Sequence, residues 1–136
     1  MAYSPLGRGV LTTNYKSPQE FEEGDWRHTS PRFKHENFEA NLKLREQLEL
    51  KAYRKGCTIS QLVLAWLMAQ GEDIFPIPGT KRIKYLEENM GALKVHLTEE
   101  EIAAIREACE ELNVSGDRYP EHMMGALFAD TPPLDT

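Results

Sequence analysis

Two stretches of the chain carry apolar residues at the spacing of an amphipathic helix. From Glu36 to Lys55 the apolar positions recur near helical spacing, at Phe38, Leu42, Leu44, Leu48 and Ala52. Gly56 would end this helix, because glycine readily adopts the left-handed conformation that closes a helix. Further on, Thr98 and Glu101 form a capping-box pair ahead of a second apolar stripe that runs toward Asn113 and Ser115. That stripe consists of Ile102, Ile105, Cys109 and Leu112.

A third helix and a short strand are predicted between these two helices. Thr58 and Gln61 form another capping-box pair, and the run LVLAWLMA that follows is apolar all round until Gly71. This pattern predicts a fully buried helix. The segment Asp73–Ile77 is typical of a buried parallel strand, provided that Pro76 lies at the end of the strand.

A turn and a fourth helix should follow that strand. The turn residues Pro78 and Gly79 lead into Thr80, which can cap a helix from about Lys81 to Asn89. Two other segments lack a regular pattern: residues 14–35 predict a long irregular loop, and residues 116–136 predict a tail that docks a short helix. The order of helices and strands belongs to the α/β class, in which crossover helices separate parallel strands.

Composition and charge exclude several classes of function. With 40% hydrophobic and 28% charged residues, the chain has the composition of one globular domain. Its net charge of −6 comes from 22 acidic and 16 basic residues without long runs of one sign, which argues against binding to nucleic acid or to a membrane surface. The longest apolar run, residues 62–69, is too short to span a bilayer. Cys57 and Cys109 form no CxxC pair, so we expect reduced thiols and a cytoplasmic protein.

Two glycine-containing loops carry the chemistry of a phosphate site. In the segment 77–82, backbone amides at a helix N-terminus, a glycine and two cations together suit a phosphate, although ordinary turn and capping chemistry would use the same residues. In the segment 3–9, a hydroxyl, a guanidinium and the amides of a glycine-bracketed turn suit a diphosphate. In a (β/α)₈ barrel the loops after the last two strands commonly build such a site, so the two loops support each other.

Three segments of the sequence together resemble a known protein family. The segments YSPLGRG, DIFPIPGTKRIKYLEENMGAL and LTEEEIAAI are similar to the last two barrel strands and the following helices of aldo-keto reductases. The resemblance extends from Tyr3 to about Leu134, so residues 1–136 read as one partial aldo-keto reductase domain. It implies the C-terminal portion of a (β/α)₈ TIM barrel, with about two strands plus helices, and an NADP-dependent oxidoreductase of aldehydes or ketones.

The resemblance also implies which residues bind NADP(H). Tyr3 would stack on or flank the nicotinamide. The residues that would wrap the diphosphate are Ser4, Pro5, Leu6, Gly7 and Arg8. The adenosine ribose and its 2′-phosphate would lie against Gly79, Lys81 and Arg82, and the adenine against Tyr85, Glu88 and Asn89. The loop 14–35 would fold over the cofactor, with Arg32 either reaching the diphosphate or remaining solvated.

The catalytic residues of the family lie in segments that this chain does not contain. The Asp, Tyr, Lys and His of the family's catalytic site come from the first half of the barrel, and a full barrel needs about 250 residues whereas this chain has 136. We therefore assign no catalytic residue and expect the chain alone to be inactive. We expect Tyr15, Tyr53 and Tyr119 to pack. The four histidines lack ligand spacing, so no metal is expected.

Three interpretations of the whole chain stay open. It could be part of an NADPH-dependent carbonyl reductase that acts on its carbonyl substrate only when the missing half is supplied. It could instead be a non-catalytic nucleotide-binding or interaction protein that associates with itself or another chain through open sheet edges. The third interpretation is a truncated gene product.

Overall fold

The computed structural model describes residues 1–12, 15–125 and 127. Its strands are β1 (Ala2–Tyr3) and β2 (Pro76–Ile77), and its α-helices are α1 (His35–Lys55), α2 (Ile59–Met68), α3 (Ile83–Met90), α4 (Glu99–Glu111) and α5 (Glu121–Met124). Short 3₁₀ helices occur at η1 (Gly7–Gly9), η2 (Pro18–Glu20), η3 (Trp26–Thr29), η4 (Pro31–Phe33) and η5 (Gly91–Lys94). Within these residues, none of the helices is both long and apolar enough to cross a bilayer.

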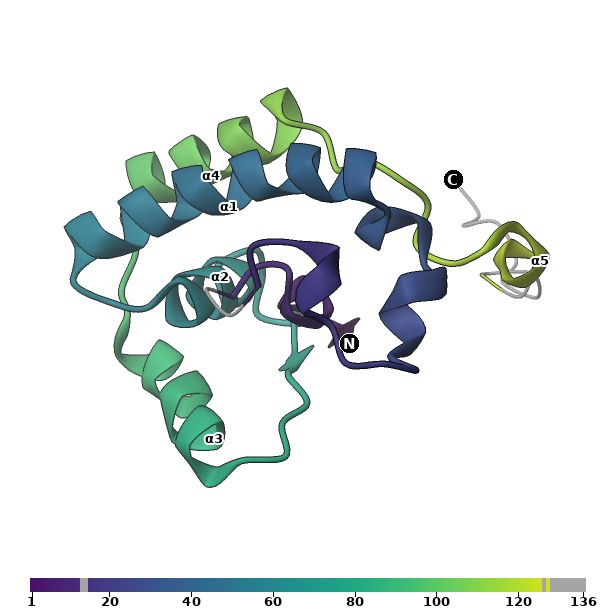
Figure 1. Ribbon diagram of the computed structural model, residues 1–136. Helices are drawn as coiled ribbons and strands as arrows, with labels where there is room; N and C mark the ends of the chain where they lie inside the picture. Colours follow the sequence, from purple (N-terminus) through teal and green to yellow (C-terminus); the bar gives the residue numbers. More distant parts are fainter. Residues whose placement is uncertain (13–14, 126, 128–136) are drawn as a thin grey trace, which may run out of the picture.

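The two strands pair in parallel although they are far apart in the sequence. Ala2 lies opposite Pro76 and Tyr3 opposite Ile77, and the Ala2 amide donates to the Phe75 carbonyl at 2.8 Å. Helices α1 and α4 run side by side, α2 lies next to the strands, and α3 lies at the lower edge of the view in Figure 1, where it contacts α2. The chain is therefore rich in helix, with a two-stranded parallel sheet.

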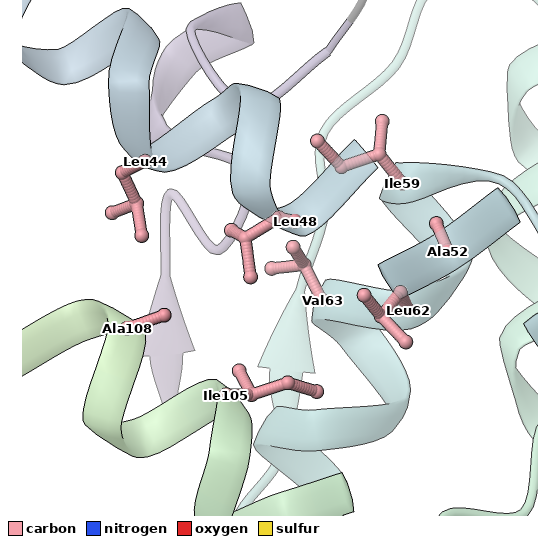
Figure 2. Close-up of a cluster of buried hydrophobic side chains, with 8 residues drawn as sticks. All are labelled: Leu44, Leu48, Ala52, Ile59, Leu62, Val63, Ile105 and Ala108. Carbon is pink, nitrogen blue, oxygen red and sulfur yellow. The ribbon is translucent and has the colours of Figure 1, made fainter. Parts of the chain in front are cut away.

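The main core lies where three helices meet. Figure 2 shows its eight buried side chains, which come from α1, α2 and α4. They are Leu44, Leu48, Ala52, Ile59, Leu62, Val63, Ile105 and Ala108. The helical periodicity predicted Leu44, Leu48 and Ala52 of α1 and Ile105 of α4, because residues three and four apart share one helix face. It did not predict Ala108, and the predicted Ile102, Cys109 and Leu112 are only half-buried.

The two predicted capping boxes and the predicted glycine at the end of α1 are confirmed. The Thr58 hydroxyl accepts from the Gln61 amide at 3.2 Å, and the Gln61 side-chain oxygen accepts from the Thr58 amide at 3.1 Å. Thr98 and Glu101 form the same reciprocal pair at the start of α4. Gly56 ends α1 with φ +72°, in the left-handed conformation.

Three predictions about individual elements are wrong. The helix α2 is not fully buried, because its last turn from Trp66 to Met68 lies at the rim of the core and is only half-buried. The strand β2 is not buried either: Ile77 is 47% exposed, because helices cover the sheet on one side and no third strand lies beside it in the described residues. Thr80 does not cap α3; its hydroxyl accepts from the Arg82 amide, and the helix begins only at Ile83.

The predicted irregular loop is in fact ordered around a small aromatic core. Its turns η2, η3 and η4 pack through Phe21 and Phe33 against Phe38 of α1, with ring centroids 5.6 to 6.3 Å apart. The short helix predicted in the tail is α5. Residues 13–14, 126 and 128–136, which include the start of the predicted loop and the end of the predicted tail, lie outside the described residues.

Candidate functional site

Parallel pairing of β1 and β2 brings the two glycine-containing loops to the same edge of the sheet. Each loop leaves the carboxyl end of its strand, and the carboxyl ends of parallel strands lie at one edge. A cavity of about 1040 Å³ opens between the loops, α1 and the start of α2. Eight of the twelve residues singled out from the sequence line it, namely Ser4, Pro5, Leu6, Arg8, Gly79, Tyr85, Glu88 and Asn89.

The other four singled-out residues lie around this cavity rather than in its wall. Tyr3 and Gly7 border a second cavity, of about 290 Å³, on the same first loop. Lys81 and Arg82 are exposed on the turn between Thr80 and Lys84, both of which line the large cavity. The geometry therefore brings all twelve residues to the region of the two loops, with the exposed cations Lys81 and Arg82 next to residues that line the large cavity.

The first loop curls tightly through left-handed backbone conformations. Ser4, Gly7, Arg8 and Gly9 have φ values of +51°, +58°, +56° and +98°. A side chain at Gly7 would place its Cβ 2.8 Å from a methyl carbon of Val10, so the curl requires glycine there. Ser4 and Arg8 adopt the same region without being glycine, which is a costly conformation that the surrounding contacts must hold.

The side chain of Arg8 is held between two aromatic rings. Its guanidinium lies 4.4 Å from the ring centroid of Trp26 and 4.5 Å from that of Tyr119, and its Nη1 donates to the Arg118 carbonyl at 3.0 Å. Trp26 belongs to the long loop, whereas Tyr119 and Arg118 belong to the tail. Arg8 thus ties the first loop to both segments.

A half-buried ion pair supports the first loop. Arg27 contacts both carboxylate oxygens of Asp25, with the closest nitrogen to oxygen distance at 2.6 Å, and the two side chains are 13% and 18% exposed. The same guanidinium donates to the Arg8 carbonyl and to the Tyr15 hydroxyl, at 3.2 Å each. The hydrogen bond from Arg27 lowers the pKa of Asp25 below its usual value of 3.8. The carboxylate stays ionised at neutral pH and holds Arg27 under the loop.

The second loop carries cations and an aromatic ring. Lys81, Arg82 and Lys84 are exposed, and the Arg82 guanidinium lies 5.8 Å from the ring centroid of Tyr85. Behind this loop, the Gln61 side chain of α2 donates to the Glu88 carbonyl at 3.1 Å, which joins the start of α2 to α3. Asn89 is buried beside it, 9% exposed.

Several residues of the large cavity were not found from the sequence. They are Tyr15, Arg27, Glu49, Tyr53 and the start of α2 at Thr58, Ile59 and Ser60. The capping box marks Thr58 as a helix start, but no sequence signal places that helix beside the two loops. The packing prediction is wrong for Tyr53, which is 83% exposed at the cavity, whereas Tyr15 packs against Phe21 and Tyr119 against Arg8.

Burial changes the pKa values of Arg32 and of the two cysteines, which were also considered in the sequence analysis. Arg32 is half-buried and donates from Nε to the Gly116 carbonyl at 3.1 Å; burial and the positive charges of Arg118 and Arg8 lower its pKa. Burial likewise raises the pKa of the Cys57 and Cys109 thiols, both of which are free. No cluster of three or more metal-ligating side chains occurs in the part of the chain that the structure describes.

Comparisons with a family model and with individual proteins point to the same family. A family model described as "Aldo/keto reductase family" matches residues 1–110. The chain is 54% identical over 134 residues to "Aldo-keto reductase yakc [NADP(+)]" of Schizosaccharomyces pombe and 50% identical over 134 residues to "Aldo-keto reductase str7" of Strobilurus tenacellus. Each alignment covers 98% of this chain but 39% of the relative. The chain thus spans about two fifths of the length of these curated relatives.

Proposed function

Because the chain belongs to the aldo/keto reductase family, we propose that it is the NADP(H)-binding C-terminal portion of a (β/α)₈ reductase of aldehydes or ketones. The observation that carries this proposal is the parallel pairing of β1 and β2, which opens both glycine-containing loops onto one cavity of about 1040 Å³. The printed name of the Schizosaccharomyces pombe relative, which includes NADP(+), supports the choice of cofactor.

The residues around the cavity fit the parts of this cofactor. The curled first loop, with glycine required at position 7, lets a diphosphate approach the backbone closely. At the other end, the exposed cations of Lys81 and Arg82 suit the 2′-phosphate, and Tyr85 offers a ring on which adenine can stack. Glu88 and Asn89 line the same end of the cavity and offer hydrogen bonds to the adenine edge.

The proposed role of this chain is binding and orientation. When bound, the cofactor supplies a hydride to the carbonyl carbon. Tyr3 flanks the nicotinamide, and Ser4, Pro5, Leu6, Gly7 and Arg8 surround the diphosphate. The proton donor of the family comes from a segment outside these 136 residues, so the chain alone binds the cofactor and does not reduce the substrate.

A second candidate function is favoured by the exposed apolar face of α3. Ile83, Leu86 and Met90 are 76%, 52% and 57% exposed, and their spacing places them along one face of the helix. Phe75, just before β2, and Ile77, within it, are also exposed. Such a face suits pairing with another protein surface, as in a nucleotide-binding protein that associates with itself or with a second chain.

The proposed cofactor preference is tested by removing the two exposed cations. In the double variant K81M/R82M we expect the dissociation constant for NADPH to rise about tenfold, because two charge-assisted contacts to the 2′-phosphate are lost. The dissociation constant for NADH, which lacks that phosphate, should not change. The matched control K43M/R54M removes two charges from α1, both exposed, and should leave both constants unchanged. An equal weakening of NADPH and NADH in K81M/R82M would contradict the assignment.

A further inference from the structure

The segment 115–119 of the tail is docked firmly against the first loop and the long loop. Asn41 of α1, 6% exposed, accepts from the Ser115 amide at 2.9 Å and donates to the Ser115 carbonyl at 3.0 Å. Arg32 donates to the Gly116 carbonyl, and a Cβ at Gly116 would come within 2.9 Å of the Pro31 backbone. The tail segment therefore has a defined position.

This docking fixes the guanidinium of Arg118 on the ring of Tyr3. The guanidinium carbon lies 3.8 Å from the ring centroid, and Nη2 donates to the Tyr3 carbonyl at 3.3 Å. The Arg118 carbonyl in turn accepts from Arg8 at 3.0 Å and from the fully buried Ser30 hydroxyl at 3.4 Å. Both ends of Arg118 are held, so its charge stays at one face of the Tyr3 ring.

Arg118 has no ion-pair partner among the described residues. There, no carboxylate oxygen lies within 4.0 Å of the guanidinium groups of Arg8, Arg32 or Arg118. These three arginines line the same small cavity as Tyr3. The charge of Arg118 is therefore held beside Tyr3 without a described ion-pair partner.

A positive charge at this place distinguishes the two oxidation states of a nicotinamide. The reduced ring is uncharged and the oxidised ring carries one positive charge, whereas the diphosphate, the adenosine and the 2′-phosphate are the same in both forms. Tyr3 is 40% exposed, and a nicotinamide stacked on the face of its ring opposite Arg118 would lie about 7 Å from the guanidinium. For dielectric constants from about 80 down to about 20, repulsion at that distance weakens binding of the oxidised form about threefold to about fiftyfold.

We propose that Arg118 is a specificity-determining residue that makes the site prefer NADPH over NADP⁺, through its fixed position behind Tyr3. This inference rests on the proposed function, because it requires the nicotinamide to lie against Tyr3. Arg118 acts through Tyr3 and is a positioning residue, not a catalytic one. Asn41 and Arg8 share in this role by holding the tail segment in place.

The test compares dissociation constants for NADPH and NADP⁺, measured by calorimetry on the 136-residue chain. In R118M we expect the ratio of the NADP⁺ constant to the NADPH constant to fall at least threefold relative to the unsubstituted chain. R118K keeps the charge and should keep most of the ratio. R106M, which removes another arginine that stacks on an aromatic ring, is the matched control and should not alter it. High salt should lower the ratio in the unsubstituted chain but not in R118M.

Other outcomes overturn the inference in distinguishable ways. If R118M weakens both cofactor forms equally, Arg118 only holds the tail, and the proposed discrimination is wrong. The proposed discrimination is also wrong if R118M has a normal circular dichroism spectrum and an unchanged ratio of the NADP⁺ to the NADPH dissociation constant. If R118M does not fold, the R118K ratio and the salt dependence of the unsubstituted chain still decide the question. If the unsubstituted chain binds neither form, the proposed function itself fails, and this inference fails with it.

Discussion

At the scale of single residues, the first loop depends on side chains from other parts of the chain. Arg8 adopts a left-handed backbone conformation, and its carbonyl and guanidinium are held by Arg27, Trp26 and Tyr119. Such conformations cost about 1–3 kcal/mol and persist only when the surroundings enforce them. The Asp25–Arg27 pair is therefore part of the support for the proposed diphosphate loop.

The substitution D25N should destabilise the chain in a pH-dependent way. At pH 7 we expect a loss of about 2 kcal/mol in the free energy of unfolding, because Arg27 keeps its charge without a carboxylate partner. The folded-state pKa of Asp25 lies below 3.8, so its contribution is present above pH 3.8 and is lost as the pH falls through the folded value. Urea denaturation at several pH values measures this difference, with D73N, at an exposed aspartate, as control. A difference that persists unchanged at pH 2 would contradict the assignment.

Residue chemistry could be predicted from the sequence where partners lie close along the chain. The capping-box pairs Thr58 with Gln61 and Thr98 with Glu101 were predicted because their partners are three residues apart. The contact between Arg8 and the Arg118 carbonyl spans 110 residues, and no local pattern indicates it. Of the three arginines beside Tyr3, Arg8 and Arg32 were singled out from the sequence, and Arg118 was therefore found only from the fold.

At the scale of elements, α3 differs from the other long helices in keeping its apolar face exposed. Helix α1 buries Leu44 and Leu48 against α2 and α4, whereas α3 leaves Leu86 and Met90 uncovered. The sequence predicted α3 as a helix but could not predict this exposure, because burial depends on which other elements are present. The same reason explains why β2 has the sequence of a buried strand and is exposed.

The exposed face of α3 predicts that the chain self-associates and that one substitution weakens this association. In L86E we expect a lower weight-average mass at high protein concentration, because a carboxylate would have to be buried in the interface. Sedimentation equilibrium measures the effect. The matched control is L50E on α1, since Leu50 and Leu86 are each 52% exposed. Equal effects of the two substitutions, or a monomer at every concentration, would exclude α3 as the interface.

At the scale of the whole molecule, the proposed function depends on one long-range feature. The pairing of Ala2 with Pro76 and of Tyr3 with Ile77 places a loop near the N-terminus and a loop from the middle of the chain around one cavity. The order of elements and the glycine-containing loops indicated this arrangement from the sequence. The walls of the cavity contributed by α1 and the start of α2 could not be predicted, because they depend on how the helices pack on the strands.

The most direct test of the proposed function follows NADPH on the isolated chain before and after an aldehyde is added. We expect a saturable change in NADPH fluorescence as the chain is titrated, because both loops bind the cofactor. Benzaldehyde, added at saturation, should cause no NADPH oxidation above the rate measured without protein. Oxidation above that rate would contradict the claim that the chain binds without catalysing, and an absence of any fluorescence change would contradict the proposed cofactor site.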